Sequence, residues 1–243
     1  MVLERNLVDR GQPVTVVASG LDNGPDHWVH LSDDVFFGGQ FAEALRHFSG
    51  DVLVHIQADA MVVDMDYFLA RLRFGYEQFS PGVWAPNVDY THYRTSLVRD
   101  RGPIKRDFNR QLDPFIVDVL NTDCTCWSLN AAVVERLREF IGPEWKFGWG
   151  WDTLAAATSW SLGYRVLRDT RVTVRHPRGT GYSARVASKE FEEVKSSLPI
   201  PTQKMISLQE QLIGERYHHS GHWFSDQWHS RKSMLRRPRG RSS

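Results

Sequence analysis

The residues from Phe147 to Tyr182, FGWGWDTLAAATSWSLGYRVLRDTRVTVRHPRGTGY, are the stretch from which the rest of the chain is interpreted. A loop rich in glycine and tryptophan precedes Asp152, where a short helix is predicted to begin. We expect Gly163 to end that helix, because glycine readily adopts the left-handed conformation that follows many helices. An alternating extended segment then ends at His176. A carboxylate and an imidazole are thus predicted at a helix start and a strand end, where open α/β domains build their sites.

A third candidate, Asp59, follows the predicted buried strand Asp51–Gln57 (DVLVHIQ). A carboxylate in that place can hold a hard divalent cation, or it can be an ordinary turn residue. His176 is either a ligand of a borderline metal such as Mn²⁺ or a structural histidine. Asp152 is either a helix N-cap or a general base. Because all three residues are expected at one rim of the sheet, we favour the functional interpretations.

Two tryptophans, Trp149 and Trp151, closely precede Asp152, and the chain contains nine tryptophans in all. Indole rings offer flat faces on which the apolar face of a sugar can lie. The alternative is that both are core aromatic residues. We interpret them as contacts for a carbohydrate acceptor.

The composition fits one domain with an appendage, since the chain has 243 residues and a formal net charge of +1. That charge gives no general attraction for nucleic acid or acidic membranes. Basic residues gather at 231–243, which we expect to be a solvated, disordered tail rather than a phosphate-binding arm. No apolar run approaches the ~20 residues of a membrane span, and no signal peptide is recognisable.

The two cysteines, Cys124 and Cys126, are separated by one residue in a predicted strand. Their Cα atoms would lie about 7 Å apart, which is too far for an unstrained disulfide. Unpaired thiols fit a reducing compartment, so a cytoplasmic location is expected.

The chain begins with a predicted helix, 2–10, before its first extended run, Val14–Ala18. Doubly wound sheets normally begin with a strand, so an opening strand is predicted to be missing. The polar stretch 87–114 is expected to be either a functional lid or disordered. Further helices are predicted at 40–47, 131–140 and 204–216. Two more helices are predicted, one capped by Asp66 and one that begins at Ser188. Further strands are predicted at 82–86 and 121–129.

The order of these segments resembles family 2 glycosyltransferases of the GT-A fold, over about Val14 to Tyr182. The motifs are the DNGPD loop, a glycine-led helix, a strand ending in QADA, a cysteine-containing strand, GWGWD and VRH. The resemblance implies an α/β protein with a mixed, mostly parallel central sheet flanked by helices. Residues 1–185 would form the GT-A domain, 186–230 a helical C-terminal extension and 231–243 the basic tail.

The resemblance also implies roles for individual residues. Asp59 looks like the last Asp of the Asp–x–Asp element that holds a metal and the donor diphosphate, and His176 would complete the metal site. Asp152 looks like the catalytic base. The remaining donor-binding residues would be Asp22, Asn23, Asp26 and Gly39. The implied activity is inverting transfer from a nucleotide-diphosphate sugar to a glycan or another hydroxyl acceptor, with Mn²⁺ or Mg²⁺ as cofactor.

Some positions depart from the family pattern. Gln57 stands where the first Asp of Asp–x–Asp is common, and Trp151 replaces the Glu of the usual Glu-Asp pair. Leu154 and Thr158 occupy positions where an Asp and an Arg often follow. The alternative function is therefore a catalytically silent module that binds a glycan or a protein partner. Nucleic acid is not an expected partner, and dimerisation through the C-terminal helices is left open.

Overall fold

The structure is a computed structural model that describes residues 2–21, 23–89, 106–111, 113–140, 145–176 and 183–219. Its helices are α1 (Val2–Val8), α2 (Phe37–His47), α3 (Met65–Phe79), α4 (Ala131–Arg138), α5 (Trp151–Ser161), α6 (Ala184–Ser197) and α7 (Ile200–His219). Its strands are β1 (Val17–Ser19), β2 (Val29–Leu31), β3 (Val52–Ile56), β4 (Met61–Val62), β5 (Val83–Asp89), β6 (Arg106–Gln111), β7 (Ile116–Val119), β8 (Cys126–Asn130) and β9 (Val166–Arg175).

The central sheet has seven strands in the order β3-β8-β5-β9-β7-β6, and β4 also pairs with β9. It is mixed, as predicted, but the expectation of a mostly parallel sheet was wrong. Among the described strands of this sheet, only β5 and β9 pair in parallel. The reason is that β8 lies antiparallel between β3 and β5, while β7 returns as a hairpin with β6.

The directions of the strands nevertheless place the site. Strands β3 and β5 both run antiparallel to β8, so they point the same way, and β9 is parallel to β5. The carboxyl ends of β3 and β9 therefore meet at one edge of the sheet. Asp59 follows the first of these ends and His176 follows the second.

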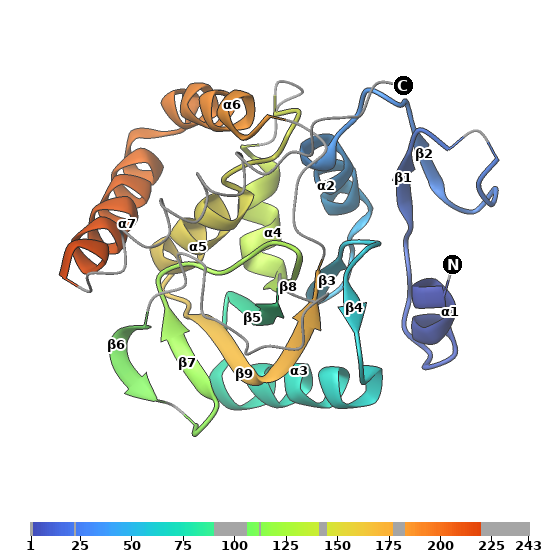
Figure 1. Ribbon diagram of the computed structural model, residues 1–243, viewed down its shortest axis with the longest axis horizontal. Helices are drawn as coiled ribbons and strands as arrows, with labels where there is room; N and C mark the ends of the chain where they lie inside the picture. Colours follow the sequence, from blue (N-terminus) through green and yellow to red (C-terminus); the bar gives the residue numbers. More distant parts are fainter. Residues whose placement is uncertain are drawn as a thin grey trace, which may run out of the picture.

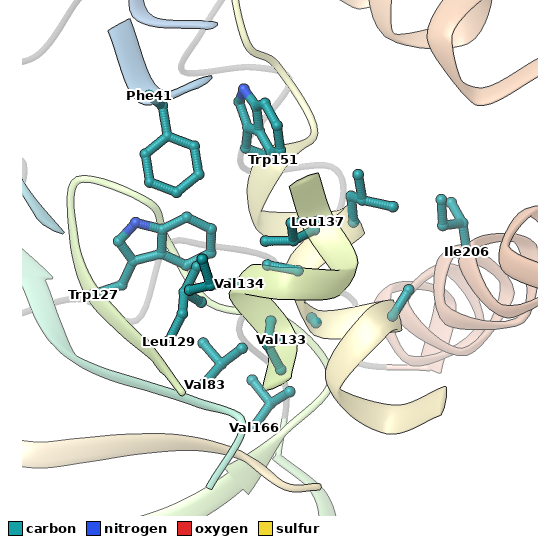
Figure 2. Packing of buried hydrophobic residues seen from close by; sticks show 14 of the residues in the cluster. Phe41, Val83, Trp127, Leu129, Val133, Val134, Leu137, Trp151, Val166 and Ile206 are labelled. Atoms are coloured by element: carbon teal, nitrogen blue, oxygen red, sulfur yellow. The ribbon is translucent and has the colours of Figure 1, made fainter. Parts of the chain in front are cut away.

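Helices cover both faces of the sheet (Figure 1). One face carries α4 and α5, and its core includes Phe41, Trp127 and Trp151, whose rings converge in Figure 2. The other face is covered by α3, whose Phe68 packs edge-on against Trp84 of β5. Burying such large apolar side chains on both faces supplies the main favourable free energy of folding.

The N-terminal strands form a sheet of their own. β1 pairs in parallel with β2, and no described strand pairs with the edge of β3 that faces away from β8. In Figure 1, β1 and β2 stand apart from the central sheet, beside α1. Within the described residues, this arrangement agrees with the predicted absence of an opening strand from the central sheet.

One predicted helix cap needed correction. Asp64, and not Asp66, caps α3 by accepting a hydrogen bond from the Tyr67 amide at 2.9 Å. Asp66 instead pairs with Arg10 at 2.6 Å. The end of α5 is as predicted, because Gly163 follows it with φ of 78°.

The polar stretch 87–114 lies largely outside the described residues. Its described parts contribute the end of β5 and the strand β6, so it is not irregular throughout. The expected domain boundary after residue 185 falls inside α6. The basic tail, 231–243, lies outside the described residues.

Candidate functional site

The shared edge of β3 and β9 brings two predicted metal ligands into contact. His176 Nε2 lies 3.1 Å from Asp59 Oδ1 and 3.0 Å from Gln57 Oε1. The imidazole is almost buried, with 10% of the side chain exposed, whereas the Asp59 side chain is 58% exposed. The backbone amide of His176 donates to Asp89 O at 3.0 Å, which fixes the strand end. In this pair, His176 is held at the strand end and its side chain is nearly buried, whereas the Asp59 side chain is open to solvent.

Asp152 lies in the first turn of α5, directly after a tight loop. The residue that precedes the helix, Gly150, has φ of 86°, and a Cβ there would meet Phe191 at 2.2 Å. Only glycine fits this combination of a left-handed backbone and a close neighbour. Asp152 Oδ1 accepts a hydrogen bond from the Thr153 amide at 2.8 Å. The loop therefore fixes the direction from which the carboxylate enters the site.

The environment of Asp152 raises the pKa of its carboxyl to about 7. Burial is the main cause, because it disfavours the charged form, and the nearby Asp123 carboxylate adds to it. Hydrogen bonds from the backbone, including the one from Thr153, act in the opposite direction. A carboxyl with this pKa can accept a proton near neutral pH and still be ionised in a large fraction of molecules.

The loop before α5 is held by Glu190 of α6. Its Oε2 accepts a hydrogen bond from the Lys146 amide at 3.0 Å. Its Oε1 accepts from the amides of Phe147 at 2.8 Å and Gly148 at 3.3 Å. One carboxylate thus satisfies three consecutive backbone donors of the segment that leads to Asp152. This anchor joins the predicted C-terminal extension directly to the site.

A single cavity of about 1460 Å³ connects these groups. Its polar lining includes Asp59, Asp123, Asp152 and His176, together with Asn121 and Gln57. The predicted base and both predicted metal ligands therefore line one cavity. The cavity continues past them into an apolar region between β1 and β3.

The two tryptophans that precede Asp152 have different environments. Trp149 lines the cavity and is 36% exposed, so a ligand can reach it. Trp151 is fully buried and stacks on Trp145 at a centroid distance of 4.1 Å. The prediction that Trp151 contacts an acceptor was wrong, because its ring belongs to the core (Figure 2).

The predicted nucleotide-binding residues do not gather at the cavity. Asn23 and Asp26 are exposed in the loop between β1 and β2, and neither lines the cavity. Gly39 lies in the first turn of α2, where a Cβ would approach Val35 at 2.6 Å. Asp22 lies outside the described residues.

The described residues contain no group of three or more His, Cys, Asp or Glu side chains arranged to hold a metal ion. The available set is one carboxylate, Asp59, one imidazole, His176, and the amide oxygen of Gln57. Mg²⁺ and similar ions are commonly held by one or two protein carboxylates, with substrate phosphates and water filling the other positions. The set therefore fits a cation that is shared with a diphosphate, and does not fit a closed protein site.

Sequence reasoning missed three residues of this site. Asp123 and Asn121 come from the polar stretch NTD before β8, which was predicted to be part of a strand. Asn121 Nδ2 donates to Thr153 Oγ1 at 3.2 Å, beside the base. The density of short polar residues in NTD was the available signal, since it favours a turn. Glu190 gave no such signal, because it lies in a charged helix.

Both cysteines are unpaired, as predicted. Cys124 lines the cavity, and burial followed by the carboxylates of Asp152 and Asp123 raises the pKa of its thiol. Burial likewise raises the pKa of Cys126. Neither thiol is therefore suited to act as a nucleophile.

No protein-family model matches the chain, and no curated protein matches it. Among solved structures, the chain is similar to the crystal structure of A197 from STIV, with a TM-score of 0.42 and 15% sequence identity. The match covers 68% of this chain and 85% of that chain. In the part of the chain that the structure describes, no helix has the length and apolar character needed to cross a membrane.

Proposed function

We propose that the protein is an inverting glycosyltransferase that moves a sugar from a nucleotide-diphosphate donor to a hydroxyl group of a glycan or another acceptor. The observation that carries this proposal is the carboxyl of Asp152, whose pKa is raised to about 7 in a cavity that also holds the Asp59–His176 pair. This reaction needs a base whose pKa lies near neutral pH and residues that can bind a cation, and we assign these roles to Asp152 and to the Asp59–His176 pair. The motif order that resembles family 2 glycosyltransferases adds support.

The proposed reaction balances as a direct displacement. The acceptor hydroxyl oxygen attacks the anomeric carbon while Asp152 takes the hydroxyl proton, and the bond from that carbon to the diphosphate oxygen breaks. Attack from the face opposite the leaving group inverts the configuration. Asp59 and His176 would hold Mn²⁺ or Mg²⁺ together with the diphosphate. When bound, such a cation neutralises the negative charge that develops on the leaving group.

The lining of the cavity suits the two substrates. Trp149 is 36% exposed and lines the same cavity as Asp152, so we propose that the acceptor sugar lies against its ring while a sugar hydroxyl faces the base. Asn121 supplies a neutral amide near the same place. The Asp59 side, at the carboxyl ends of β3 and β9, is left for the charged donor.

The test begins with binding. Thermal unfolding should be measured with a panel of nucleoside diphosphates, with and without Mn²⁺, because a ligand of the native state raises its stability. The nucleotide that stabilises the protein in the presence of Mn²⁺ then selects the donor for turnover assays. The Asp152→Asn variant should keep this stabilisation and lose turnover by roughly 10²–10⁴-fold, which is the usual contribution of a general base.

The matched control is Asp9→Asn, which changes an exposed aspartate that does not line the cavity. It should leave turnover unchanged. If Asp152→Asn turned over at the wild-type rate, Asp152 would not be the base. If no nucleotide stabilised the protein but a glycan did, the result would favour the silent glycan-binding module.

A further inference from the structure

Helix α7 reaches the candidate site through one buried side chain, Gln209, to which the proposed reaction gives no role. We propose that Gln209 is a positioning residue for Asp152, because its amide holds residues 120–125, which contact the helix turn that carries this carboxyl. The proposal deepens the proposed function. Its effect on turnover rests on that function, whereas its effect on the Asp152 carboxyl does not.

The contact is a buried hydrogen bond between residues far apart in the sequence. Gln209 is 3% exposed, and its Nε2 donates to the carbonyl oxygen of Leu120 at 2.6 Å. Leu120 is also buried, and it is the first residue after β7. In the low dielectric of a protein interior, such a bond is stronger than it would be in water. It therefore fixes the backbone where residues 120–125 begin.

Residues 120–125 connect β7 to β8 and contact the first turn of α5. Asn121 Nδ2 donates to Thr153 Oγ1 at 3.2 Å. The backbone amide of Thr153 in turn donates to Asp152 Oδ1 at 2.8 Å. A chain of hydrogen bonds and one peptide link therefore joins the Leu120 carbonyl, which α7 holds, to the carboxyl of the proposed base.

The same connection carries two ionisable groups that interact with Asp152. The carboxylate of Asp123 adds to the effect of burial, which raises the pKa of Asp152 to about 7. Burial is also the main cause that raises the pKa of the Cys124 thiol, and the Asp152 carboxylate adds to it. The interaction between two charges weakens with their separation. The titration of Asp152 therefore reports where residues 120–125 lie.

Stability alone does not account for a glutamine at this position. The Oε1 atom of Gln209 is buried and has no hydrogen-bond partner among the described residues. Ile206, one turn earlier in α7, is fully buried in the main core. An apolar side chain at 209 would avoid the cost of burying an amide oxygen that has no donor. What the amide adds is a hydrogen bond that holds one carbonyl in one place.

The test replaces Gln209 with methionine, which has a similar length and no donor. The titration of Asp152 is followed by NMR in protein labelled with carbon-13 aspartate, and its signal is the one that Asp152→Asn lacks. In Gln209→Met the titration midpoint should fall by roughly one pH unit, because a more distant Asp123 and a better hydrated carboxyl both favour the charged form. Gln209→Leu, which also lacks a donor, should give the same shift.

Turnover supplies a second measurement once a donor is known. In Gln209→Met, kcat should fall roughly tenfold, because a small displacement of a catalytic group is costly. The KM for the donor should change little, because the Asp59–His176 pair lies at the ends of β3 and β9 and has no printed contact with α7. A structural defect alone would lower the amount of folded enzyme and leave the titration of Asp152 unchanged.

The matched control is Gln203→Met on the same helix. Gln203 Nε2 donates to Leu198 O at 2.7 Å and to Ser196 O at 3.2 Å, so its amide holds the junction of α6 and α7. Gln203 does not line the cavity. This control matters because α7 also packs directly against α5. Gln203→Met should leave both the titration of Asp152 and kcat at their wild-type values.

A shift of the Asp152 titration in Gln209→Met and Gln209→Leu, but not in Gln203→Met, would support the proposal. An equal shift in Gln203→Met would show that any loosening of α7 acts on α5, and would overturn it. A wild-type titration in both Gln209 variants would also overturn it. If wild-type protein turned over no donor, the proposed function would fail, and the titrations would still decide whether Gln209 positions Asp152.

Discussion

At the scale of the residue, Asp152 links the stability of the protein to pH. Its folded pKa of about 7 lies above the ~3.9 of an unfolded aspartate. The stabilisation from holding this proton is complete below pH ~3.9 and is lost as the pH rises through about 7. We predict that Asp152→Asn gains stability relative to wild type between pH 5 and pH 8, measured by urea unfolding.

Asp123→Asn supplies the matched comparison, because it removes the neighbouring carboxylate and keeps an oxygen to accept from the Thr125 amide. This substitution should lower the pKa of Asp152 and reduce the loss of folding stability as the pH rises. A stability difference between wild type and Asp152→Asn that stays constant from pH 5 to pH 8 would contradict the raised pKa.

The individual residues also show what a sequence can predict about a site. Asp59 and His176 were both expected at strand ends, and the structure brings them within 3.1 Å. Trp151 could not be separated from Trp149 by its neighbours in sequence. Trp149 lies in the loop before α5, and the left-handed backbone of Gly150 separates it from Trp151, the first residue of the helix, so one ring lines the cavity and the other belongs to the core.

At the scale of the element, the loop before α5 depends on Glu190. The Glu190→Gln substitution replaces the oxygen that accepts from the Lys146 amide with a donor, so that amide loses its partner. We predict faster hydrogen exchange at residues 146–148. A fall in kcat of roughly tenfold should accompany it, because small displacements of a catalytic group are costly. The KM for the donor should change little.

Glu193→Gln is the control on the same helix, because Glu193 is exposed and pairs only with Lys189 across one turn among the contacts that the structure describes. It should change neither exchange nor kcat. Slow exchange at 146–148 in Glu190→Gln would show that the loop is held by its other contacts.

Individual helices and strands could be predicted better than the pairing between the strands. The glycine- and tryptophan-rich loop before Asp152 and the glycine at 163 indicated where α5 begins and ends, and a run such as DVLVHIQ indicated a strand. Nothing in that run specifies that its neighbour is β8 and runs antiparallel, because strand pairing depends on contacts distant in sequence. The resemblance to a mostly parallel fold therefore gave the wrong pattern of pairing.

At the scale of the whole molecule, α6 and α7 both contribute buried side chains to the main hydrophobic core. Ile206 of α7 is fully buried within it, whereas Leu208 is 49% exposed. We predict that Ile206→Ala lowers the free energy of unfolding by about 2–5 kcal/mol in one cooperative transition. Leu208→Ala should change it by less than about 0.5 kcal/mol. Two separate transitions in calorimetry would show that the C-terminal helices form an independent unit.

The place of β9 has a consequence for synthesis on the ribosome. β9 pairs with β4, β5 and β7, so it joins the two halves of the sheet. It comprises residues 166–175 of a chain of 243, and about two thirds of the polypeptide emerges before it. Until then the apolar edge of β5 has no partner on that side. The growing chain therefore carries an unpaired apolar strand edge from the synthesis of β5, which ends at Asp89, until that of β9, which begins at Val166, and this is the interval in which chaperones can protect it from aggregation.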